Sequence, residues 1–450
     1  MKNLAIKNKA HYIILVILIK ILYIYLNVLM LPEEWASFDF DRNIQISNFI
    51  WEIPVFCILL ITYLKYLRPG HPISFAITVL FCLYFIPSNS CLVLSDYSIL
   101  YYLLINIFNI LLMIFVGKIS FNIKLQNIES KYNEIDFQKN KNLNRILRNL
   151  TIFTCFGVIA YVYFIGGGID LSQIFNEDIY GRRAALADFY LMHTDGLIAY
   201  LMVFWTAFYS TMLIVGLYLS IQNKRYLDVI LCLLAYLVLF SFDSQKSILL
   251  KPVIAFYIFF LYKRNKLNKV EYVFLIGYFF ICCFSLLEYV LNNESSIYTI
   301  VIRRITYMPQ YLSHAYYDFF EANDKLWLTR DFFQLEKIVR LFISSSYQHG
   351  AVTIIGDNCF PGIPSPNTGL FAEAFAQLGY IGVFLMPLVY AYLIKIYYKY
   401  AIVFGKGGSS VLLASLALSL INIQLLAPRG ILIILIFMLV SIWVRKTSKI

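Results

Sequence analysis

Hydrophobic residues along this 450-residue chain gather into long uninterrupted runs instead of alternating with polar positions. A helix needs about 20 apolar residues to cross the hydrocarbon layer of a bilayer, and most of the runs approach that length. The pattern therefore predicts an all-α, polytopic membrane protein with about twelve transmembrane helices. The predicted spans are residues 11–31, 49–67, 73–87, 97–116, 149–165, 195–220, 226–242, 247–262, 271–291, 371–397, 409–427 and 429–445.

Two boundaries of this pattern are informative. The third run is expected to end at Pro87, because proline interrupts a helix. The first run follows a basic stretch, is too long for the core of a signal peptide, and has no small-residue cleavage site before Pro32. We therefore expect it to be a retained signal anchor.

Composition excludes the common soluble classes. Hydrophobic residues make up 60% of the chain and charged residues only 14%, with 36 Tyr and 38 Phe. Soluble domains are about 25% charged, and disordered or nucleic-acid-binding chains are more polar still. The net charge of +11 is therefore tested first as a difference between the two sides of the membrane, and not as evidence for a nucleic-acid partner.

Basic residues sort by side when the N-terminus is placed in the cytoplasm and the spans alternate. Of the 37 Lys and Arg, 24 then fall in cytoplasmic segments and 12 in external segments, while Lys20 stays inside the first span. Cytoplasmic segments of membrane proteins carry an excess of these residues. This distribution predicts that both chain ends are cytoplasmic.

Within this single membrane-embedded domain, 1–450, two external segments are large enough to carry chemistry, 166–194 and 292–370. In the larger one, residues 326–342 place Trp327 and several phenylalanines at helical spacing, which predicts a helix lying in the headgroup plane. The basic segment 117–148 is expected to be a cytoplasmic linker.

Several chemistries lack their motifs. The chain has no Walker A loop, no GxGxxG and no HExxH, and its eight cysteines show no metal-binding spacing, so no metal or other cofactor is expected. Six of the cysteines lie in apolar runs. The other two, Cys91 and Cys359, both fall in predicted external segments, where a disulfide between them is conceivable.

The main indication of function comes from Lys and Arg residues in predicted external segments, where few basic residues are expected. A single interfacial arginine often only anchors a helix among headgroups, but here separate segments present arginine to the same external face. The guanidinium group offers a planar fork of donors that matches phosphate oxygens. We therefore predict a site for a lipid pyrophosphate, formed by Arg182, Arg183, Lys246, Arg303, Arg304 and Arg429.

One acid and two histidines are candidates for a general base. Glu373, one turn into the tenth predicted span, is the first choice, because a carboxylate at membrane depth usually faces a cavity or an ion partner. The alternative for Glu373 is a structural salt bridge to one of the arginines. His349 and His314 in the large loop follow, although each also fits a surface or packing role. Gly379 and Gly382 indicate close helix packing.

The chain resembles bacterial O-antigen polymerases (Wzy), the oligosaccharide repeat-unit polymerases. The resemblance covers the architecture of about a dozen spans with one medium and one large external loop. Locally it rests on Tyr180-Gly-Arg-Arg183, Ser244-Gln-Lys-Ser-Ile-Leu-Leu250, Arg303-Arg304 followed by Met308-Pro309, and Asn367-Thr-Gly-Leu-Phe-Ala-Glu373 with Gly379-Tyr-Ile-Gly382.

This resemblance implies a GT-C-like helical fold in the bacterial inner membrane. It also implies metal-independent glycosyl transfer at the periplasmic face, with undecaprenyl-pyrophosphate-linked glycans as donor and acceptor and a chain-length regulator protein as partner. Sugar contacts are expected from Asp195, Tyr307, Trp327 and Asn367. Two other functions stay open, a flippase or transporter of lipid-linked oligosaccharide and an O-antigen ligase.

Overall fold

The computed structural model describes residues 9–31, 45–122, 125, 141–165, 197–243, 246–331, 335–344, 346–360, 369–421, 425–426 and 428–447. Within these ranges every regular element is a helix and none is a strand. The first helices are α2 (Ala10–Met30), η2 (Ile46–Asn48), α3 (Phe49–Tyr66), α4 (Pro72–Leu80), η3 (Phe81–Phe85), α5 (Ile86–Leu94), α6 (Ile99–Ile119), α8 (Lys141–Ile165), α10 (Leu197–Gln222) and α11 (Tyr226–Asp243).

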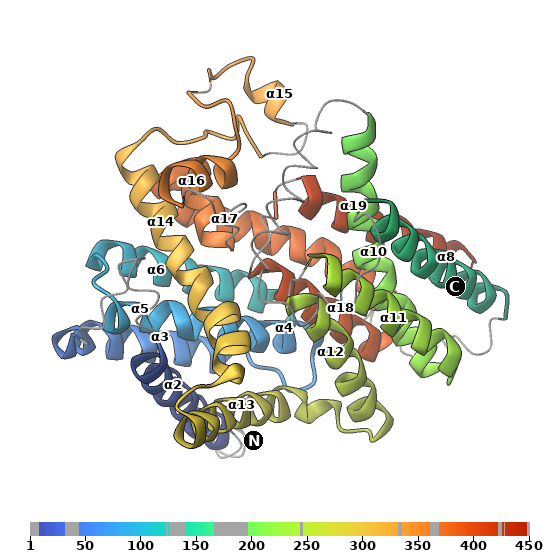
Figure 1. Cartoon of the computed structure of the whole chain (residues 1–450), viewed down its shortest axis with the longest axis horizontal. Coiled ribbons are helices and arrows are strands. Elements are labelled where there is room, and N and C mark those ends of the chain that lie inside the picture. Colours follow the sequence, from blue (N-terminus) through green and yellow to red (C-terminus); the bar gives the residue numbers. More distant parts are fainter. Residues whose placement is uncertain are drawn as a thin grey trace.

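The remaining helices complete the bundle seen in Figure 1. They are α12 (Lys246–Lys263), η5 (Leu267–Lys269), α13 (Val270–Asn292), η6 (Tyr298–Tyr307), α14 (Met308–Ala322), α15 (Leu335–Val339), α16 (Ala351–Cys359), α17 (Leu370–Ala401), η7 (Ile402–Phe404), α18 (Gly405–Leu420) and α19 (Pro428–Thr447).

Eight helical stretches in the described ranges are long and apolar enough to cross a membrane, the last of them running from α17 into α18. The chain is thus an all-helical protein with the character of a multi-pass membrane protein. Each of the twelve predicted segments overlaps a helix in the described residues, but α11, α12 and α19 fall outside the eight stretches. The count of twelve spans therefore stays a prediction.

The third predicted span is longer than expected, and its predicted end at Pro87 is wrong. The helix continues through α5 to Leu94, with the π-helical turn η3 just before the proline. Proline lacks an N–H and its ring clashes with the carbonyl four residues earlier in a regular α-helix. The wider π turn relieves this clash. This span is also the most enclosed one, because the whole of its apolar window is buried.

Contacts between helix ends bring together the connections that the charge pattern assigns to the cytoplasm. We call this side the basic end. Lys9 donates to the Leu64 carbonyl at 2.5 Å, and Arg445 donates to the Lys399 carbonyl at 2.6 Å. The other contacts at this end join Arg68 to Ser120, Gly70 to Glu271, His71 to Tyr398 and Arg148 to Asp228.

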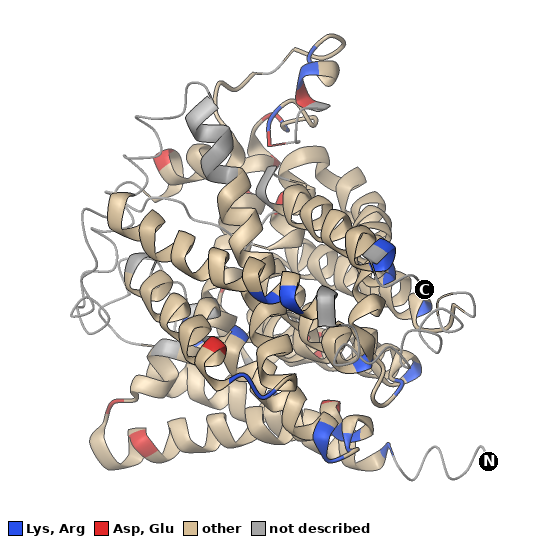
Figure 2. Cartoon of the chain, turned by 90° about the vertical axis from the view of Figure 1, so that its right-hand side faces the viewer, with Lys and Arg blue, Asp and Glu red and all other residues tan. Residues whose placement is uncertain are grey.

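These contacts are what alternating spans produce, because every residue in them lies near the start of an odd-numbered predicted span, near the end of an even-numbered one, or in a connection between the two. Figure 2 shows that most Lys and Arg of the described helices lie toward one side of the molecule, at the right in that view. In the predicted linker 117–148, residues from Lys141 onward already belong to α8. The predicted external loop 166–194 lies outside the described residues.

The large segment 292–370 holds a feature that the hydrophobic pattern did not predict. Residues 298–322, η6 and α14 together, form one continuous helical rod that crosses the bundle (Figure 1). Its first part packs against α2, α12 and α13, and its second part packs against α5, α16 and α17. We call it the crossing helix. Its buried face combines aromatic residues with Thr306, Gln310 and Ser313, so its mean hydropathy is too low to identify a span.

The helix predicted over 326–342 is largely wrong as a helix, while its predicted position in the headgroup plane stays a prediction. Within its described residues only Leu335–Val339 is helical, and Trp327, Leu328 and Asp331 have positive φ angles of 50°, 60° and 55°. Side chains with a Cβ seldom adopt this conformation. The chain instead turns tightly here to reach the neighbouring helix α17.

A kink in α17 explains that turn. Gly379 has φ 58° and ψ −136°, which only glycine adopts readily, so the helical hydrogen bonding is interrupted there. The Ala376 and Gln377 carbonyls accept from the backbone N–H groups of Leu326 and Trp327 at 2.9 and 2.8 Å. A Cβ on Gly382 would lie 2.1 Å from the Ala374 carbonyl of the same helix. The glycines thus permit a kink, whereas the sequence predicted close packing between helices.

Candidate functional site

The crossing helix carries four of the predicted site residues. Arg303 is buried, with 6% of its surface exposed, and Arg304 is half-buried. Both lie in η6, which packs against α12, the helix that begins at the predicted Lys246. Tyr307 and His314 follow further along the rod. The crossing helix thus carries residues predicted to contact the pyrophosphate and a residue predicted to contact the sugar.

Other predicted residues cannot be placed at the level of their side chains. Lys246 and Arg429 lie at the starts of α12 and α19, but only their backbone belongs to the described structure. Their roles stay predictions. The residues that lie outside the described ranges altogether are Arg182, Arg183, Asp195 and Asn367.

His314 contacts a carboxylate that was not predicted from the sequence. Its Nδ1 lies 2.9 Å from Oδ2 of Asp318, one turn further along α14. In the neutral imidazole, a proton on Nδ1 that points to this carboxylate leaves the lone pair on Nε2. The His314 side chain is 18% exposed and that of Asp318 55% exposed. A histidine oriented in this way has the geometry of a general base. The i, i+4 spacing of the two residues was the signal that could have identified the pair.

Two tyrosines hold the His314 ring from other directions. Tyr97, in the turn between α5 and α6, stacks on it with ring centroids 3.9 Å apart and an interplanar angle of 18°. Tyr101 meets it edge-on at 4.8 Å and donates to the Gln310 carbonyl. His314 and Asp318 with these tyrosines form what we call the histidine cluster. A ring fixed by two aromatic contacts and one contact with a carboxylate loses little orientational freedom on binding a substrate.

Tyr307 joins this cluster from the η6 side. Its hydroxyl lies 3.1 Å from Ser95 Oγ, and the phenol is close enough to Tyr97 to interact with it. Burial raises the pKa of Tyr97 and of Tyr307 well above the usual range, so both hydroxyls keep their protons at neutral pH. The structure thus brings together two predicted residues, Tyr307 and His314, that lie seven positions apart.

Glu373, the first-choice base, lies in a closed environment. Its side chain is 1% exposed, and its carboxylate accepts from Tyr390 Oη at 2.8 Å and from the backbone N–H groups of Leu425 and Leu426 at 2.9 and 2.8 Å. These partners are a phenol and two backbone N–H groups, and none of them is the arginine of the alternative prediction, a structural salt bridge. Three donors on one carboxylate instead tie the start of α17 to the connection before α19.

His349 and Trp327 are separated from the histidine cluster in the described contacts. His349 is exposed just before α16, and Trp327 is 40% exposed in the turn against α17. Cys91 is buried and Cys359 exposed, and both are free thiols, so the conceivable disulfide is not formed.

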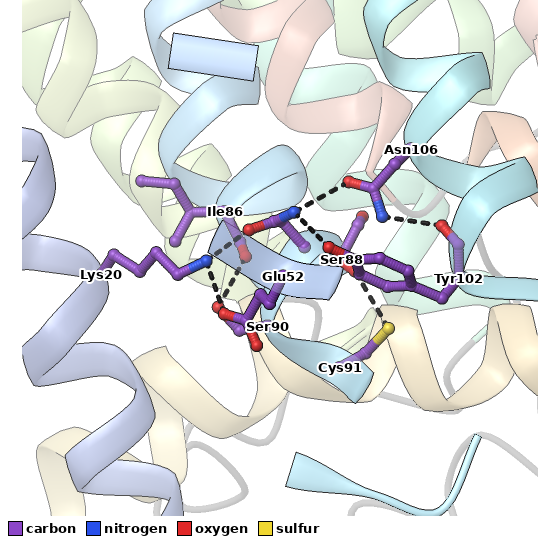
Figure 3. Close-up of polar contacts among 9 residues, drawn as sticks. Lys20, Glu52, Ile86, Ser88, Ser90, Cys91, Tyr102 and Asn106 are labelled. Atoms are coloured by element: carbon purple, nitrogen blue, oxygen red, sulfur yellow. Dashed lines mark hydrogen bonds and ion pairs between the residues drawn. The ribbon is translucent and has the colours of Figure 1, made fainter. Parts of the chain in front are cut away.

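A second polar site lies among the first spans and was not predicted. Lys20, the cation left inside the first span, forms an ion pair with Glu52 of α3, with Nζ and Oε1 2.5 Å apart. Lys20 also donates to Asn89 of α5 and lies 4.2 Å from the centroid of the Phe56 ring. Figure 3 shows the Lys20 side chain reaching from its helix to Glu52 on a neighbouring helix.

The network continues into α6. Asn89 donates to Tyr102 Oη at 2.9 Å and to Asn106 Oδ1 at 3.3 Å, and Asn106 donates to the Tyr102 carbonyl. Glu52 is 0% exposed and Lys20 is 7% exposed, so both charges lie in the protein interior. The available sequence signal was a lysine in one span and a glutamate in the adjacent span, since intramembrane charges usually pair.

Comparison with known proteins adds no further constraint on this site. No protein-family model, no curated protein and no solved structure matches the chain.

Proposed function

We propose that this protein polymerises undecaprenyl-pyrophosphate-linked oligosaccharide repeats by glycosyl transfer. The observation that carries the proposal is the crossing helix, which bears a carboxylate-oriented histidine and a pair of arginines on one rigid element. About ten residues separate Arg304 from His314, or ~15 Å at a rise of 1.5 Å per residue. The long arginine side chain spans part of this distance, and a sugar ring occupies the rest.

In the proposed reaction His314 Nε2 takes the proton from a hydroxyl of the non-reducing sugar of one lipid-linked repeat. The hydroxyl oxygen forms a bond to the anomeric carbon of the growing glycan. The bond from that carbon to the pyrophosphate oxygen breaks, and its electron pair leaves with undecaprenyl pyrophosphate. Arg303 and Arg304 stabilise the charge that develops on this leaving group, and Arg182, Arg183, Lys246 and Arg429 complete the anion site.

His314 replaces Glu373 as the preferred base in this proposal. Glu373 already accepts three hydrogen bonds and is buried, whereas His314 is partly exposed and has a second ring nitrogen for the substrate. Asp318 acts as the positioning residue. Half-buried Tyr97 is the proposed sugar contact of the cluster, and buried Tyr307 supports its ring; Asp195, Trp327 and Asn367 are additional candidates for sugar contacts.

The wider setting belongs to the same proposal. The chain spans the bacterial inner membrane twelve times in a GT-C-like fold, with the basic end in the cytoplasm and the histidine cluster toward the periplasm. Supporting this, the contacts at the basic end join the connections that carry the excess of Lys and Arg. A chain-length regulator is the proposed protein partner.

The test uses the purified full-length chain in nanodiscs with a synthetic undecaprenyl-pyrophosphate-linked repeat. Wild-type protein is expected to give a ladder of longer products. His314→Gln should slow elongation by about 10²–10⁴-fold, the usual contribution of a general base. The matched control is His11→Gln, an exposed histidine at the basic end, which should leave the ladder unchanged. Wild-type rates in His314→Gln would overturn the role of His314.

Two other outcomes would overturn the polymerase proposal as a whole. Transfer of the glycan to lipid A-core instead of to a second repeat would identify a ligase. Passage of the labelled lipid-linked repeat across a vesicle membrane, without elongation, would identify a flippase.

The flippase keeps its place as a second candidate because of two observations. The buried Lys20–Glu52 pair and the kinked α17 are features that transporters use, namely ionisable groups within the membrane and interrupted helices. If Lys20→Met and Glu52→Gln abolished passage of lipid-linked oligosaccharide in intact, folded variants, this candidate would be favoured.

A further inference from the structure

A short segment beside α17 exposes an unusual amount of apolar surface. Ile338, Leu341 and Phe342 are 55%, 79% and 83% exposed, at spacings of three and four residues. Backbone hydrogen bonds continue the turn of α15 beyond its last residue, because Leu341, Phe342 and Ile343 all donate to carbonyls three or four positions earlier. The three side chains therefore share one face, with exposed Lys337 beside them. We call this the 337–343 face.

The structure fixes the depth of this segment relative to the membrane-spanning part. The chain just before it is bonded to Ala376 and Gln377, the seventh and eighth residues of α17. Gln377 also accepts from Leu328 N at 3.0 Å and donates to the Arg330 carbonyl at 2.9 Å. At 1.5 Å per residue these contacts lie ~10 Å from the start of α17. With the start of α17 placed at the outer edge of the headgroup region, which is about 5–7 Å thick in one leaflet, the attachment lies near the boundary with the hydrocarbon.

Side chains fix the other end of the segment to the same place. Arg340 Nε donates to the Thr329 carbonyl at 2.7 Å, and Arg330 donates twice to the Tyr347 carbonyl at 2.9 and 2.8 Å. The turn containing Leu341 and Phe342 is thus held on both sides while its apolar face points away from these contacts. Figure 1 shows α15 outside the bundle, beyond α16 and α17.

Helix α17 also exposes apolar side chains. Beyond its kink, Ile381, Phe384 and Leu388 are 59%, 55% and 52% exposed and follow one side of the helix. In an apolar candidate span such a stripe is the side that faces lipid. Through its hydrogen bonds to Ala376 and Gln377, the loop that carries the 337–343 face is attached to α17 four residues before this stripe begins.

We propose that the 337–343 face is a membrane anchor that inserts into the bilayer surface at the headgroup boundary. Ile338, Leu341 and Phe342 occupy the outer part of the acyl layer, and the Lys337 ammonium pairs with lipid phosphate. The partner is the phospholipid surface surrounding the protein, and the site is independent of the proposed transferase reaction. Its consequence is to hold the loop over 326–350 against the membrane at one depth.

Photocrosslinking tests this anchor directly. A benzoyl-phenylalanine placed at Phe342 of the full-length chain, reconstituted in vesicles of phosphatidylethanolamine and phosphatidylglycerol, is expected to give lipid adducts by mass spectrometry. Benzoyl-phenylalanine at Phe384 is the positive control on the α17 stripe. The same label at Ser346, an exposed polar position that bonds Asp324, is the matched control and should give far fewer lipid adducts.

Each other result would overturn the proposal. Adducts at position 342 with a second protein chain, or with a second copy of this chain, would identify a protein partner for the face. Yields at 342 no higher than at 346 would show that the face is in water. A second measurement keeps the test independent of the label: in Leu341→Glu/Phe342→Glu, hydrogen exchange over 335–343 in vesicles should rise at least tenfold. Unchanged exchange would also overturn the anchor.

Discussion

The ion pair between Lys20 and Glu52 supports the sharpest prediction about stability. At 2.5 Å and an effective dielectric constant of about 20, the attraction between two unit charges is ~7 kcal/mol. Removing both charges from water costs several kcal/mol for each ion, so the net value of the intact pair is close to zero. Removing one partner is different, because the other charge stays buried without compensation.

Lys20→Met should therefore cost about 3–5 kcal/mol, the usual penalty for a broken buried pair. Lys20 also donates to Asn89, which would lose that bond as well. Glu52→Gln leaves the lysine with Asn89 as a partner and should cost less. The double variant Lys20→Met/Glu52→Gln should be more stable than the sum of the single effects predicts, because no unpaired charge is left in the interior.

The assay is reversible unfolding of the purified chain in mixed micelles, read as a double-mutant cycle. The coupling between the two positions should exceed about 1 kcal/mol, well above the few tenths seen for independent sites. A control cycle pairs Lys20→Met with Tyr398→Phe, at the basic end. Additive effects at Lys20 and Glu52, or single variants as stable as wild type, would refute the reasoning.

Three further predictions concern the region around α17. Gly379→Ala forces a side chain into a positive-φ conformation and should cost about 1–3 kcal/mol, with faster proteolysis at 326–331; an unchanged midpoint and digestion pattern would contradict the kink as a fixed feature. Asp331→Ala removes the carboxylate that accepts from Ala351 N at 2.7 Å and should lose about 0.5–2 kcal/mol, while Asp331→Asn keeps an acceptor and should be tolerated. Because burial raises the pKa of Asp331, its contribution to stability should become more favourable as the pH falls from neutral through that pKa, and Asp331→Asn should lose this dependence, as pH-resolved melting would show. Glu373→Gln replaces one carboxylate oxygen by an NH2 group, which cannot accept the hydrogen bond from the Leu425 or Leu426 N–H, and should lower stability by about 1–3 kcal/mol. A Glu373→Gln variant that is fully stable but inactive would instead support Glu373 as the general base.

The helical frame could be predicted from sequence because it depends on long apolar runs, which have few other solutions in a bilayer. The pairing of helix ends was also predictable, since Arg68, Lys9 and Arg445 lie where the charge rule requires them. The crossing helix could not be predicted from the sequence. Its buried face uses polar groups such as Gln310, which bonds Ser88 at 2.7 Å, and such a face has no hydropathy signal.

The candidate site was predicted in part for a related reason. His314 and Tyr307 were identified by residue type, but the partners that orient them lie elsewhere, in Tyr97 and Ser95. Glu373 was predicted as the base because it is a carboxylate at membrane depth. That property does not distinguish a reactive carboxylate from one that already accepts hydrogen bonds from backbone N–H groups. Likewise, apolar spacing over 326–342 predicted a helix because the carbonyls that capture Leu326 and Trp327 belong to a distant segment.

The hydrogen bonds between Leu326–Trp327 and the α17 kink impose an order on biogenesis. Leu326 leaves the ribosome fifty residues before its acceptor Ala376. At about 5–20 residues per second the nascent turn waits ~2–10 s for its partner. During that interval the stretch after the crossing helix has to remain open while α17 is still being delivered to the membrane. The turn therefore closes only after α17 has inserted, as one of the last steps by which the nascent chain reaches its mature form.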